Sequence, residues 1–322
     1  MAGELARAKR FIFHISGALE ARLPRVQVVG GQHAQLDFRL PDWHLVIAPV
    51  DDRRGEHDFG FVVEATSALP PGAADVDQLT GRLFLVLSFV ASREVGVRPV
   101  CGFSEARELI WASWGSPRLR PGRPGVRWCP PHLVVGALPA VAEGFARLFE
   151  QDEAMGVVVG RAIEHLLAAD GNEALDVRVP VSCAGIETLG WAILQRHSWV
   201  DRDVSEKMPA AAMTRLLLRW AGVPAAIPVG FAALAARRDS RHRGGGGPEV
   251  LSGVRNKLVH PPNRLDSPEW PSSEELAECW QLANWFRELV VLRALGYQGQ
   301  YWSRLRLGTY GADLEQVPWS AG

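Results

Sequence analysis

The hydrophobic pattern of the chain changes near residue 140, and this change constrains the fold more than any other feature. Before it, short apolar segments partly alternate with polar residues and are separated by Gly, Pro and Asp, which is typical of strands. After it, apolar residues recur at helical spacing. The sequence therefore predicts an α+β protein with a β-rich N-terminal domain (1–139), an all-α helical bundle (140–310) and a tail (311–322).

The expected elements follow from the same patterns. Strands are predicted at 10–15, 26–29, 34–40, 43–48 and 59–65, then a helix at 75–94 and a hairpin built from 98–103 and 108–114. Helices are predicted at 140–150, 153–169, 180–195, 210–222 and 273–296. Pro180 is placed at the start of one helix and Gly296 just past the end of another, where these residues are favoured.

Composition excludes several classes of protein. The net charge of −1 argues against a general polycation. The four cysteines form no CxxC pair and no zinc-ligand pattern with nearby histidines, so we expect no metal and no cofactor. The most apolar stretch, 83–91, is about half the length needed to span a bilayer, and the start of the sequence does not resemble a signal peptide. We expect a cytoplasmic protein with no membrane partner.

One short segment, VRNKLVHPPN (254–263), carries candidate chemistry. Asn256 and His260 are four residues apart and would share one face of a helix, with Arg255 on its flank. The prolines that follow His260 predict that the helix ends there. Histidine can take or give a proton near neutral pH, and arginine can bind a phosphate through two N–H groups.

The RNKLVH string resembles the R-x(4–6)-H signature of the HEPN superfamily, whose domains are α-helical bundles with this motif near the start of a late helix. Many HEPN domains are metal-independent endoribonucleases of antiviral defence, abortive infection or toxin systems, and they commonly dimerise around a shared cleft. The resemblance implies a hydrolase, a nuclease that cleaves RNA by attack of the 2′-OH. It assigns Arg255 and His260 as catalytic and Asn256 as supporting. Lys257, beside them in the sequence, is predicted to contact the substrate.

Glu187 is the only charged residue between Val179 and Gln195. A carboxylate in such apolar surroundings needs a cation nearby. Arg255 is the natural candidate, and an acidic residue on an earlier helix also occurs in some HEPN sites. The alternatives are that Glu187 pairs with another arginine or points to solvent. We include Glu187 among the catalytic residues.

Several alternatives stay open. The motif could be a local capping and packing cluster, and a HEPN-like bundle could be a non-catalytic module that dimerises, regulates a partner protein or binds nucleotides beside a separate nucleotidyltransferase. The basic segment 237–247 is expected to be a flexible connector, either a solvated loop or a flap whose Arg241 and Arg243 would contact RNA. The tryptophans are expected in the core, including Trp111, Trp114, Trp191, Trp220, Trp280 and Trp285.

Partners follow from these hypotheses. RNA is the expected substrate, although residues 150–322 hold 18 basic and 21 acidic side chains, so any RNA contact should be local. A homodimer, or a larger homo-oligomer, would supply two proton-transfer groups to one cleft. The apolar helix at 274–296 is expected to provide much of its interface. The β-rich domain would sense a trigger or hold the nuclease in check. A trigger or a partner protein is therefore also expected.

Overall fold

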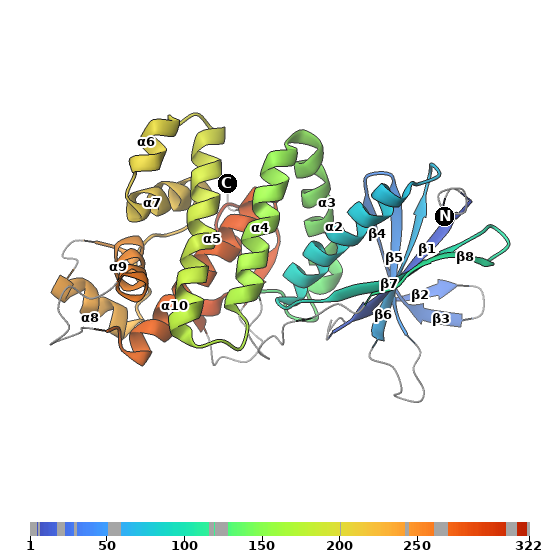
Figure 1. Cartoon of the computed structure of the whole chain (residues 1–322). Coiled ribbons are helices and arrows are strands. Elements are labelled where there is room, and N and C mark those ends of the chain that lie inside the picture. Colours follow the sequence, from blue (N-terminus) through green and yellow to red (C-terminus); the bar gives the residue numbers. More distant parts are fainter. Residues whose placement is uncertain are drawn as a thin grey trace. The chain divides into compact units, whose positions relative to one another are not determined.

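The computed structural model describes residues 5, 7–17, 23–28, 31–50, 59–115, 119, 128–199, 201–241, 245–260, 270–306 and 314–320. The chain forms two compact units. The first comprises residues 1–122 and 129–150, and the second comprises 123–128 and 151–322. The first contains a β-sheet and the second is helical (Figure 1), so the α+β class with a helical C-terminal part is confirmed. The boundary expected near residue 140 falls inside a helix that groups with the sheet.

The sheet of the first unit has six antiparallel strands in the order β4-β5-β6-β1-β7-β8. Its strands are β1 (Arg10–Ser16), β4 (Leu36–Leu40), β5 (Trp43–Pro49), β6 (Phe59–Ser67), β7 (Gly96–Phe103) and β8 (Leu109–Ser113). β2 (Arg25–Val28) and β3 (Gly31–Ala34) form a separate hairpin. On β1, Phe11, Phe13 and Ile15 are buried and the residues between them are partly exposed, which is the alternation that predicts a strand.

Among its described residues this unit also has the helices α2 (Ala73–Ala91) and α3 (Val134–Gln151). α2 lies against β7, and the guanidinium of Arg82 on α2 lies 5.1 Å from the ring centre of Phe149 on α3. Trp114, expected in the core, is 74 % exposed after β8. A tryptophan pattern alone therefore did not identify which rings are buried.

The second unit is built around one central helix, α10 (Ser273–Ala294), which contacts most of the other helices. These are α4 (Glu153–Ala169), α5 (Leu175–Arg196), α6 (Arg202–Lys207), α7 (Ala210–Ala221), α8 (Ala232–Arg241) and α9 (Gly247–Val259). Every residue of α10 from Leu282 to Leu292 is buried. The expectation that this helix supplies a dimer interface is therefore wrong, because its apolar side chains already form the core of one chain.

A small hairpin of β9 (Gln300–Trp302) and β10 (Leu314–Gln316), with the short 3-10 helix η1 (Arg304–Arg306) between them, packs on the bundle. Tyr297 and Tyr301 are buried, and the indole N–H of Trp285 donates to the Tyr301 hydroxyl at 3.4 Å. The aromatic segment after α10 thus belongs to the bundle. β10 lies within the residues expected as a tail.

Charged side chains are buried where this segment meets the bundle. Arg304 forms ion pairs with Asp170, at the end of α4, and with Glu288 of α10, the latter at 2.7 Å. Asn284 donates to Asp170 at 3.1 Å and accepts from Arg287 at 2.5 Å. All five residues are at most 2 % exposed. We call this set the buried charge cluster. Burial lowers the pKa of Arg287 to about 9 and raises that of Glu288.

Two local expectations for the helices were wrong. Pro180 lies inside α5, because the helix begins earlier, at Leu175, where burial of Arg178 and Val179 stabilises the extra turn. The connector predicted at 237–247 is in part helical. Arg237 lies in α8, is 7 % exposed and forms two hydrogen bonds of 2.9 Å with Glu275.

α5 is long and apolar enough to cross a membrane by length and composition alone. In the helical unit, 56 % of the most apolar 18-residue stretch of α5 is buried. Burial of this kind is typical of a core helix in a bundle. Among the residues that the structure describes, α5 is the only helix long and apolar enough to cross a membrane.

Candidate functional site

The RNKLVH segment lies on α9, whose first turn is firmly held. Glu249 accepts a hydrogen bond from the backbone N–H of Gly246 at 2.7 Å and forms an ion pair with Arg215 of α7. Gly247 is packed so closely that a Cβ there would lie 3.1 Å from the carbonyl oxygen of Ala225 and 3.2 Å from Phe286. The start of α9 is therefore fixed against α7 and α10, which limits how its far end can move.

The other end of α9 carries the predicted residues. Val250, Leu251 and Val254 are buried and anchor the helix. His260 has the extended backbone conformation that ends it, and its N–H donates to the carbonyl oxygen of Asn256 at 3.1 Å. The helix therefore ends at His260, as the prolines after it predict.

Arg255 joins α9 to α5. Its Nη2 lies 3.6 Å from Oε2 of Glu187, and its Nη1 donates to the side-chain oxygen of Asn256 at 3.0 Å. The side chains of Arg255 and Glu187 are each 28 % exposed. The expected pairing of Glu187 with Arg255 is confirmed. This arrangement orients the guanidinium and still leaves it accessible to a ligand from solvent.

The remaining motif residues lie on the surface. Asn256 and His260 are exposed, and Lys257 is half-buried. In the described part of the chain no residue forms a hydrogen bond with the imidazole of His260, a group that can take or give a proton. The Asn256 side chain does bond locally, as the capping interpretation requires, but its partner is Arg255 rather than the helix backbone.

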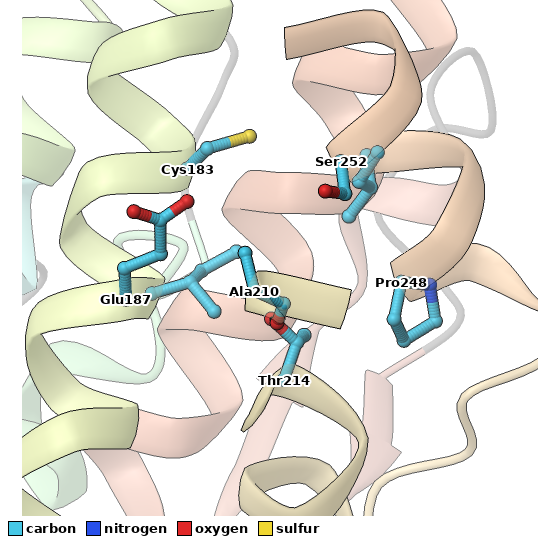
Figure 2. Close-up of a pocket in the computed structure, with 8 residues that line it drawn as sticks. Cys183, Glu187, Ala210, Thr214, Pro248 and Ser252 are labelled. Atoms are coloured by element: carbon cyan, nitrogen blue, oxygen red, sulfur yellow. The ribbon is translucent and has the colours of Figure 1, made fainter. Parts of the chain in front are cut away.

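A small pocket adjoins this ion pair, between α5, α7 and α9. The Cys183 thiol and the Glu187 carboxylate lie on its α5 side and the Ser252 hydroxyl on its α9 side (Figure 2). Its volume of about 10 Å³ has room for roughly one water molecule. Burial raises the pKa of Cys183 to about 12, so this thiol stays protonated at neutral pH and is a poor nucleophile.

The arrangement offers a cation and a proton-transfer group rather than a metal centre. No group of three His, Cys, Asp or Glu side chains that could hold a metal ion is present in the described part of the chain. Arg255 can bind an anionic oxygen, and His260 can exchange a proton with a ligand.

For two predicted substrate contacts, Arg241 and Arg243, the structure gives no side-chain position. Arg241 ends α8, but its side chain, like the whole of Arg243, lies outside the described residues. Sequence reasoning also missed Ser252 and Arg215. Ser252 is four residues before Asn256, so helical spacing alone points to it, whereas the contact of Arg215 joins two helices and leaves no local signal.

Comparisons with known proteins place the helical unit. Residues 152–315 match the family model of the YopA C-terminal domain, nearly the same residues as the second unit. The chain is 26 % identical over 249 residues to the SPbeta prophage-derived uncharacterized protein YopA of Bacillus subtilis (strain 168). That match covers 76 % of this chain and 54 % of the relative, so the chain spans about half the length of the curated relative. No solved structure matches the chain.

Proposed function

The chain belongs to the YopA C-terminal domain family, and we propose that its helical unit is a metal-independent endoribonuclease of the HEPN type. The observation that carries the proposal is the geometry of Arg255. An acidic side chain on α5 and an amide on α9 hold its guanidinium at the surface, on the same helix end as the exposed imidazole of His260. An arginine and a histidine are the groups that RNA cleavage without a metal needs.

The proposed reaction uses the substrate's own nucleophile. The 2′-OH attacks the adjacent phosphorus, a 2′,3′-cyclic phosphate forms and the 5′-oxygen leaves as an alcohol. His260 takes the proton of the 2′-OH or donates one to the leaving oxygen. Arg255 binds the phosphate and stabilises the charge that develops on it, and Lys257 offers a second cation. Glu187 and Asn256 hold Arg255 in place.

The reaction needs both a base and an acid, and one motif supplies a single imidazole. We therefore propose a homodimer in which two copies of Arg255 and His260 face one cleft. The prophage origin of the Bacillus subtilis relative and the HEPN resemblance both support a role in antiviral defence or a toxin system. In that role the β-rich unit would sense a trigger or restrain the nuclease.

A second function is favoured by charge. The net charge of −3 over residues 150–322 is unusual for a protein that binds RNA over a broad surface. In this alternative the helical unit is a non-catalytic module that dimerises or binds a partner protein. Its Arg255–Glu187 pair would then only connect two helices.

RNA cleavage in the presence of EDTA separates the two functions. We expect the full chain to cleave RNA with chelator present, and Arg255→Ala and His260→Ala each to abolish cleavage. Arg219→Ala and His132→Ala, which change exposed residues of the same types, serve as matched controls and should leave cleavage unchanged. Cleavage that requires added metal, or that survives His260→Ala, contradicts the mechanism.

A further inference from the structure

A groove of about 300 Å³ lies between α4 and α5 of the helical unit. Met155 and Val158 give it an apolar side, the indole of Trp191 lines it, and Gln195 and Arg196 lie at its polar end. Trp191 is 43 % exposed, which corrects the expectation that it lies in the core. A large aromatic ring held at the surface beside a hollow is a common feature of binding sites.

One residue of the groove, Trp191, is linked to the Arg255 site by its position on α5. Trp191 is four residues after Glu187, so the two side chains lie on the same face of the helix, about 6 Å apart along its axis. Glu187 in turn contacts Arg255. A ligand with a phosphate at Arg255 would therefore have an adjacent group within reach of Trp191.

The size of the groove and the exposed arginine at its end suit one planar ring attached to an anion. Its volume is at the lower end for small-ligand pockets. Arg196 at its end forms an ion pair with Asp152 through Nε at 2.6 Å, and its side chain is 62 % exposed, so the Nη groups can face a phosphate. Asp152 is also the cap of α4, because it accepts a hydrogen bond from the backbone N–H of Met155 at 3.3 Å. It is thus held in place while the arginine head extends outward.

More exposed rings follow immediately on the chain. The centre of the His197 ring lies 5.5 Å from that of Trp199 and 5.9 Å from that of Trp220. Trp199 is 53 % exposed. Rings in series beside a cation are the surfaces on which single-stranded nucleic acids stack successive bases. A groove for an amphipathic helix would instead need apolar anchors over several turns, and here the Asp152–Arg196 pair interrupts the apolar surface.

We propose that this groove binds an unpaired nucleobase of single-stranded RNA, stacked on Trp191, next to the phosphate held at Arg255. The proposal rests on the proposed function for the nature of the ligand and adds to it a requirement for unpaired substrate. Double-stranded RNA keeps its bases stacked on each other, so it cannot occupy the groove.

Binding rather than cleavage tests the proposal. The full chain with His260→Ala is titrated into a short fluorescently labelled single-stranded RNA, and affinity is read by anisotropy. Adding Trp191→Ala should weaken binding about tenfold, the usual effect of removing one stacking ring. Trp191→Phe should restore most of the affinity. Val157→Ala is the control and should not change the affinity. Val157 is an exposed apolar residue of α4 that does not line the groove.

RNA probes identify what occupies the groove. An RNA in which abasic residues replace the nucleotides should bind weakly, and with equal affinity to the chain that has Trp191 and to the Trp191→Ala variant. The affinity for an RNA duplex should likewise not depend on Trp191. The proposal is overturned if the Trp191→Ala variant binds single-stranded RNA as tightly as the chain with Trp191. It is also overturned if an amphipathic peptide binds tightly through Trp191 and its binding does not change the affinity for RNA. If the chain cleaves RNA but its affinity for single-stranded RNA does not depend on Trp191, only the proposed nucleobase site in the groove is refuted. Trp191-dependent binding by a chain that never cleaves RNA refutes only the proposed nuclease.

Discussion

The substitution Glu187→Gln separates a functional ion pair from a structural one. It keeps the size of the side chain and removes its charge. The Arg255–Glu187 distance is 3.6 Å, longer than a charge-assisted hydrogen bond, and both side chains are 28 % exposed. A partly solvated pair of this kind contributes about 0.2–1 kcal/mol to stability. For a unit of this size, that corresponds to a decrease in Tm of no more than about 4 °C.

Cleavage should respond far more than stability. Without the carboxylate charge, Arg255 keeps its hydrogen bond with Asn256 and loses the electrostatic attraction toward α5. We expect the single-turnover cleavage rate to fall by at least about tenfold, as it does when a positioning interaction is lost. Thermal unfolding and single-turnover cleavage of the same preparation give the two quantities. Glu206→Gln is the matched control, because Glu206 pairs with Arg202 at 3.1 Å on an exposed helix, and it should change neither quantity.

Two outcomes contradict this reasoning. Unchanged cleavage in Glu187→Gln would show that the ion pair does not position Arg255 for chemistry. A decrease in Tm much greater than 4 °C, with cleavage lost in proportion, would show that the pair supports the fold and that the loss of activity is indirect.

Three further changes test the packing of the helical unit by urea unfolding. Arg304→Ala should cost about 3–5 kcal/mol, because it removes the cation that pairs with both buried carboxylates, Asp170 and Glu288. That deficit should be smaller at pH 4 than at pH 7, since burial raises the pKa of Glu288 in the folded state and a protonated carboxyl needs no cation; an equal deficit at both pH values would contradict this. Gly185→Ala should cost about 1–3 kcal/mol, because its Cβ would lie 2.6 Å from Nη1 and 2.9 Å from Cδ of the buried Arg287. Gly190→Ala should cost less, because its closest contact, Cγ of Met213 at 2.8 Å, belongs to an unbranched apolar side chain that can change its rotamer without losing a hydrogen bond. A larger loss there than at Gly185 would refute the comparison.

Local patterns in the sequence predicted most of the elements. The strands were recognised by alternation, which burial of Phe11, Phe13 and Ile15 explains, and the long helices by their spacing. The short helices α6 and α8 were missed because they are only 6 and 10 residues long and include several polar residues. Their position depends on contacts between helices, such as the pair of Arg237 with Glu275.

The candidate site was partly predictable for the same reason. Arg255, Asn256 and His260 are neighbours on one helix, so their proximity follows from spacing. The contact with Glu187 could be inferred because that carboxylate is the one charge on an apolar segment. The groove beside Trp191 had no such signal, because exposure of a tryptophan depends on which neighbouring helices leave it uncovered.

The buried charge cluster links the stability of the helical unit to the order in which the chain is made. Asp170 is synthesised well before Arg304, and Glu288 lies between them. Until Arg304 has left the ribosome, the bundle cannot bury the two carboxylates beside their cation, and burying them alone is costly. Loss of Arg304 from a truncated chain should therefore destabilise this core and make it more susceptible to proteases. The cluster thus makes the packing of the bundle, which contains α9 and its site, depend on the segment that follows α10.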